Sequence, residues 1–94
     1  MTIHLDHTII PSRNKIASAK LLAQLLGVSW AETGFGPFAP VFVNDGLTLD
    51  FIDTDEDFPM HHLCFRVAQN EFDSILARIK QAYGAQCARK LLSL

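Results

Sequence analysis

A strand followed by an amphipathic helix is predicted twice in this chain, and this recurrence is the strongest constraint on its fold. The first copy covers residues 3–26 and the second covers residues 60–83. In each copy a short polar residue separates the strand from apolar side chains that recur at helical spacing. The pattern predicts one structural module that begins twice.

The first helix is predicted over residues 14–26. Ser12 or Asn14 can cap its start, because a short polar side chain accepts a hydrogen bond from the free N–H groups of the first turn. Gly27 suits the left-handed residue that commonly follows a helix end. The apolar face is expected to comprise Ile16, Ala19, Leu22, Ala23 and Leu26.

Alternation of side chains predicts five strands, and turn residues separate them. Pro11 is expected to end the first strand, and Asn44-Asp45-Gly46 predicts a hairpin whose residues tolerate positive φ. A second helix is expected to open at Asn70, with Phe72, Ile75, Leu76 and Ile79 on its apolar face. The predicted strands are residues 3–10, 28–33, 38–43, 47–53 and 60–67.

Length and charge limit the class of protein. A chain of 94 residues predicts one domain, and its net charge of −2 gives no basic field for nucleic acid or an anionic membrane. The first residues lack a positively charged segment followed by an apolar stretch, so no signal peptide is predicted. We therefore expect a cytoplasmic protein.

Four segments, in this order and at this spacing, resemble the vicinal-oxygen-chelate family of glyoxalases, bleomycin-resistance proteins and extradiol dioxygenases. They are Leu5-Asp6-His7-Thr8-Ile9, the end of the first helix from Ala19 to Gly27, Leu47-Thr48-Leu49-Asp50-Phe51, and His61-His62-Leu63-Cys64-Phe65-Arg66-Val67. The resemblance implies an α+β fold in which βαβββ modules form a mostly antiparallel half-barrel sheet with helices on its convex side. Residues 1–57 would form the first module, residues 58–84 the start of a second, and residues 85–94 a tail.

In that family the metal ligands lie on the first and last strands of each module. The resemblance implies His7, Asp50 and His62 as ligands of a divalent metal such as Fe, Mn, Ni or Zn. The family's last ligand, a glutamate on the final strand, has no counterpart here, so the second module is expected to be truncated. Contacts with the substrate are expected from Phe42, Thr48, Cys64 and Arg66.

Each proposed ligand also has a structural interpretation. His7 shares a strand face with Ile3, Leu5 and Ile9, so it is equally interpreted as a core histidine. Asp50 is equally interpreted as a solvated strand residue. If the strand register shifts by one residue, His61 and His62 exchange roles.

Three functions remain open from the sequence. The first is a metal-dependent lyase, isomerase or dioxygenase acting on a small substrate with adjacent oxygen atoms. The second is a binding protein without chemistry, in which Trp30, Phe35, Phe38 and Phe42 surround a small ligand. The third is an inactive truncated relative.

Because a half-complete sheet leaves an apolar face and an unpaired edge, a homodimer is expected.

Overall fold

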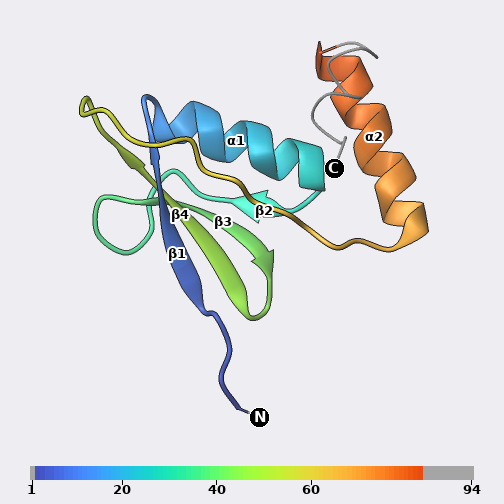
Figure 1. Ribbon diagram of the computed structural model, residues 1–94, viewed down its shortest axis with the longest axis horizontal. Coiled ribbons are helices and arrows are strands. Elements are labelled where there is room, and N and C mark those ends of the chain that lie inside the picture. Colours follow the sequence, from blue (N-terminus) through green and yellow to red (C-terminus); the bar gives the residue numbers. More distant parts are fainter. Residues whose placement is uncertain (1, 84–94) are drawn as a thin grey trace. The chain divides into compact units, whose positions relative to one another are not determined.

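The computed structural model describes residues 2–83 and contains four strands and two helices in that range. Figure 1 shows their arrangement. By its internal contacts the chain divides into a first unit, Met1–His62, and a second unit, Leu63–Leu94. The elements in chain order are β1 (His7–Ser12), α1 (Lys15–Leu26), β2 (Ser29–Trp30), β3 (Ala39–Asn44), β4 (Leu47–Asp53) and α2 (Gln69–Tyr83).

The four strands form one open sheet in the order β1-β4-β3-β2. β1 pairs with β4 in parallel, whereas the β4–β3 and β3–β2 pairs are antiparallel. A parallel pair needs a long crossover connection, and α1 lies within that connection (Figure 1). The expected α+β fold with a mostly antiparallel sheet is confirmed.

Helix α1 covers one face of the sheet and leaves the other open. It packs mainly on β3 and β4. Two small helix residues, Ala19 and Ala23, are almost fully buried, and this allows the backbone of the helix to approach the strands closely. None of the five residues of the expected apolar face is exposed. The strand residues buried on the helix side are Ile10, Ala39, Val41, Leu49 and Phe51.

The caps of α1 follow the sequence closely. The side chain of Asn14 accepts a hydrogen bond from the Ala17 amide at 3.1 Å, so Asn14 rather than Ser12 is the N-cap. Gly27 ends the helix with φ of 73°, and its amide donates to the carbonyl of Ala23. Both ends therefore satisfy backbone groups that a helix leaves unpaired.

The predicted hairpin between β3 and β4 is present, but its turn differs from the expected one. Positive φ occurs only at Gly27 and Gly36 among the described residues. The side-chain oxygen of Asn44 instead accepts a hydrogen bond from the Gly46 amide at 2.8 Å. This Asx-type turn replaces a backbone conformation that needs positive φ.

The predicted boundaries of the first strand were wrong. β1 begins at His7 instead of residue 3 and continues through Pro11 to Ser12. Proline is tolerated here because β1 is an edge strand, where one side of the backbone needs no partner. Residues 2–6 precede the strand and are exposed.

The strand expected over residues 60–67 was also wrong, because residues 54–68 contain no strand. A strand requires a neighbour that pairs with its backbone groups. No described segment pairs with residues 60–67, so alternation of side chains there produces no sheet.

Helix α2 lies in the second unit and begins one residue earlier than expected. The Glu71 carboxylate accepts a hydrogen bond from the Ala68 amide at 3.4 Å, which satisfies a free donor at the helix start. Ile75 and Ile79 are its buried residues, whereas Phe72 is partly exposed. Within residues 2–83 no helix has the length and apolarity needed to cross a membrane. The expected tail, residues 85–94, lies outside the described residues.

Candidate functional site

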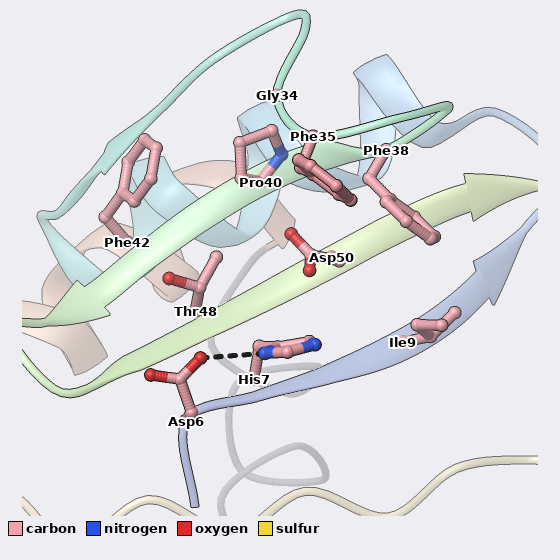
Figure 2. Close-up of a pocket in the computed structure, with 10 residues that line it drawn as sticks. All are labelled: Asp6, His7, Ile9, Gly34, Phe35, Phe38, Pro40, Phe42, Thr48 and Asp50. Carbon is pink, nitrogen blue, oxygen red and sulfur yellow. Dashed lines mark hydrogen bonds and ion pairs between the residues drawn. The ribbon is translucent and has the colours of Figure 1, made fainter.

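A pocket of about 320 Å³ lies on the open face of the sheet in the first unit. Figure 2 shows its lining residues, which come from three strands, from Asp6 just before β1, and from the loop between β2 and β3. The pocket thus lies opposite the helix-covered face. Its lining residues are Asp6, His7, Ile9, Gly34, Phe35, Phe38, Pro40, Phe42, Thr48 and Asp50.

His7 begins β1 and presents an exposed imidazole to this pocket. Its Nδ1 atom lies 2.8 Å from Oδ2 of Asp6 (Figure 2). This hydrogen bond favours the protonated ring and raises the pKa of His7 above its ordinary value, and the nearby charge of Asp50 acts in the same direction. The expectation of a core histidine is therefore wrong, because β1 turns His7 away from the helix side.

Sheet register brings Asp50 to the same pocket. In the parallel β1–β4 pair, His7 lies beside Thr48 and Ile9 lies beside Asp50. Thr48 and Asp50 are two residues apart on β4, so both point to the open face. Asp50 is half-buried. The sheet thereby supplies an imidazole and a carboxylate to one cavity.

Aromatic side chains form the opposite wall of the pocket. Phe42 extends from β3, and Phe35 and Phe38 extend from the preceding loop (Figure 2). Gly34 lets this loop approach Pro40, because a Cβ at Gly34 would lie only 2.8 Å from Cγ of Pro40. Most of the lining surface is apolar, as is usual for small-molecule sites.

The structure brings together only some of the residues expected at the site. Phe42 and Thr48 line the pocket with His7 and Asp50. His62 is exposed in a segment without strand structure and is not among the lining residues. Cys64 and Arg66 are exposed residues of the second unit, and Trp30 does not line the pocket.

Sequence reasoning missed Asp6 as a site residue. Strict alternation along a strand puts neighbouring residues on opposite faces. Asp6 precedes β1, so this rule does not govern its side chain, and both Asp6 and His7 line the pocket. An acidic residue directly before the histidine was the available signal.

Two side chains that line the pocket have the chemistry of metal ligands. Imidazole and carboxylate groups both bind divalent metals such as iron and manganese, and His7 and Asp50 provide one of each. Within residues 2–83 no three His, Cys, Asp or Glu side chains converge on one point. A metal held by His7 and Asp50 would therefore need a further donor.

Comparison with solved structures reveals clear relatives. The oxidase ChaP-H2 has a TM-score of 0.81 and 39% sequence identity, and the oxidase ChaP-H1 has 0.79 and 36%. Each comparison covers 87% of this chain, which spans 64% of ChaP-H2 and 65% of ChaP-H1. A possible glyoxalase from Bacillus cereus shares the fold, with a TM-score of 0.67 and 22% sequence identity. This comparison covers 87% of the present chain and 76% of the glyoxalase chain. No protein-family model and no curated protein matches the chain.

The fold and the likeness to the two ChaP oxidases and to a possible glyoxalase are consistent with the vicinal-oxygen-chelate superfamily that the sequence resembles. The first unit is one βαβββ module whose open face carries the pocket. The chain spans slightly less than two thirds of either ChaP oxidase.

Proposed function

We propose that this chain acts in a metal-dependent oxidase whose substrate is a small aromatic compound with two adjacent oxygen atoms. The observation that carries the proposal is the presence of His7 and Asp50 in one pocket with an aromatic wall. The identity of 39% and 36% with two proteins named as oxidases supports oxidation over other chemistries of this fold.

In this proposal His7 and Asp50 hold a divalent metal, and His62 supplies the further donor. The bound ion would contribute Lewis-acid chemistry toward the adjacent oxygens of the substrate. Phe35, Phe38 and Phe42 would bind the aromatic ring and exclude water from it. The Thr48 hydroxyl would orient the polar edge of the substrate. Contacts of the substrate with Cys64 and Arg66 stay a prediction from the family resemblance.

Calorimetric titration of metal-stripped protein with anaerobic Fe²⁺, Mn²⁺, Ni²⁺ and Zn²⁺ tests the ligands. We expect micromolar or tighter binding that is lost in His7→Ala and weakened in Asp50→Ala and His62→Ala. His4→Ala serves as the matched control, because His4 is exposed, does not line the pocket and is not a candidate ligand. Binding that is indifferent to His7→Ala contradicts the metal site.

Oxidation is tested separately with catechol as the probe, since it combines an aromatic ring with two adjacent oxygens. Iron-loaded protein is expected to consume oxygen when catechol is added, and His7→Ala is expected to abolish the consumption. Tight binding of catechol without oxygen uptake would support the second function below.

A non-catalytic ligand-binding protein is the second candidate. It is favoured by the apolar wall and by the lack of three converging metal donors within residues 2–83. In that case a small aromatic compound should bind to metal-stripped protein with unchanged affinity in His7→Ala. Phe42→Ala should weaken this binding by about tenfold, because truncation removes roughly 1–2 kcal/mol of apolar contact.

We also propose that two copies of the chain associate. Ile9 and Phe42 are 49% and 43% exposed on the open face, and β1 leaves one edge of the sheet without a partner among the described residues. Light scattering during dilution should give the mass of a dimer, and Phe42→Asp should shift the mass toward a monomer. A monomer at every concentration contradicts the proposal.

A cytoplasmic location stays a prediction.

A further inference from the structure

Asp6 and His7 are neighbours in sequence, yet both side chains line the pocket. The backbone carbonyl of Asp6 accepts a hydrogen bond from the Thr48 amide at 2.9 Å, which ties this point of the chain to β4. Its carboxylate lies 2.8 Å from Nδ1 of His7. Figure 2 shows the other ring nitrogen of His7 pointing away from Asp6.

A neutral imidazole carries its single proton on one ring nitrogen, and the hydrogen bond made by that nitrogen decides which one. An ionised carboxylate can accept hydrogen bonds but cannot donate them. Next to Asp6, the proton of His7 must therefore reside on Nδ1. The lone pair then resides on Nε2, the nitrogen that is turned away from Asp6.

We propose that Asp6 is a positioning residue that fixes the Nδ1–H tautomer and the ring orientation of His7, so that Nε2 offers its lone pair to the pocket. One part of the inference rests on the proposed function, namely that this lone pair serves to bind the metal. A carboxylate that holds the distal nitrogen of a metal-binding histidine is a general means of orienting such a ligand.

A role in stability alone does not account for this contact. Both side chains are exposed, at 59% for His7 and 86% for Asp6, and exposed ion pairs contribute little to folding. The contact instead determines which ring nitrogen can act as an acceptor or ligand. Asp6→Ala should accordingly leave the fold intact while it changes the state of the ring.

The test is long-range ¹H–¹⁵N correlation spectroscopy on metal-free, ¹⁵N-labelled protein at about pH 9, well above the ordinary histidine pKa. The signal of His7 is assigned by its loss in His7→Gln. We expect the wild-type ring to carry its proton on Nδ1 and Asp6→Ala to shift it predominantly to Nε2. Glu32→Ala removes an exposed carboxylate outside the pocket and should leave the His7 signals unchanged.

A wild-type ring protonated on Nε2, or an Nδ1–H ring retained in Asp6→Ala, would overturn the inference. Circular dichroism of Asp6→Ala verifies that the variant folds. In a second measurement, Zn²⁺ affinity should fall by about tenfold to a hundredfold in Asp6→Ala. If the tautomer responds as expected but no metal binds to the wild type, the proposed function fails and the positioning role remains. If metal binds through His7 but the tautomer is insensitive to Asp6, only the positioning role fails.

Discussion

The hydroxyl of Ser12 lies 2.6 Å from the hydroxyl of Ser18 and joins the end of β1 to the first turns of α1. Ser12 is only 8% exposed and is the buried polar residue of the described core. Its Oγ also accepts a hydrogen bond from the Asn14 amide at 3.1 Å. One hydroxyl therefore forms hydrogen bonds with two partners between the end of β1 and the start of α1.

Substitution of this hydroxyl should destabilise the first unit. Ser12→Ala leaves the Asn14 amide and the Ser18 hydroxyl without their partner, at a cost of about 1–2 kcal/mol in the free energy of unfolding. Urea titration followed by the fluorescence of Trp30, the single tryptophan of the chain, measures this change. The exposed Ser29 provides the control, and an equal loss in Ser29→Ala would contradict the explanation.

Arg13 holds the segment that leaves β4. Its guanidinium donates to the carbonyl oxygens of Thr54 and Glu56, both at 2.7 Å, and lies 4.9 Å from the ring centre of Phe58. Lysine cannot reproduce this planar set of donors. Arg13→Lys should accelerate amide hydrogen exchange over residues 54–58 by roughly fivefold, as expected for the loss of about 1 kcal/mol. Exchange within β4 should not change, and equal acceleration there would indicate general destabilisation.

Gly34 controls the shape of the aromatic wall. A methyl group there would lie 2.8 Å and 2.9 Å from ring atoms of Pro40, which cannot bend away as a flexible side chain would. Gly34→Ala should therefore displace the loop and destabilise the first unit by about 1–3 kcal/mol. Gly46→Ala is the matched control, because its methyl group would meet Asn44 only at 3.6 Å, an ordinary contact. Thermal unfolding of both variants tests this difference.

The ionisation of His7 gives a pH dependence of defined sign. The hydrogen bond to Asp6 raises the pKa of His7 in the folded chain above the value of 6.5 that applies to the unfolded chain. The folded state therefore binds the proton more tightly, and the resulting stabilisation is fully present below pH 6.5 and disappears as the pH rises through the folded-state pKa. An NMR titration should place the midpoint of His7 above 6.5 in the wild type. In Asp6→Ala the midpoint should fall, and an unchanged midpoint would contradict this cause.

The first module was largely predictable because its signals are local. The alternation of Leu47, Leu49 and Phe51 predicted β4, and Asn14 and Gly27 predicted the two ends of α1. His7, Asp50, Phe42 and Thr48 were expected at the site and do line one pocket. For α1 and β4, local pattern and the observed structure agree.

The missed features depend on pairing that side-chain alternation does not encode. Residues 60–67 alternate as a strand does, but they have no described partner and form none. β1 starts at His7 because pairing with β4 begins there, beside Thr48. That start leaves Asp6 outside the strand, where it can turn toward its neighbour. The location of His62 relative to the pocket therefore could not follow from alternation alone.

The parallel pairing of β1 with β4 determines when the pocket can form during folding. His7 and Ile9 can acquire their neighbours Thr48 and Asp50 only after α1, β2 and β3, which lie between β1 and β4 in the sequence, have been synthesised. Pairing between segments so distant in sequence must close a long loop before its contacts stabilise the chain, which slows folding. A nascent chain released from the ribosome before β4 emerges can form α1 but has no pocket. Ligand binding at this pocket would thus report the pairing of β1 with β4, because that pairing brings His7 and Ile9 beside Thr48 and Asp50.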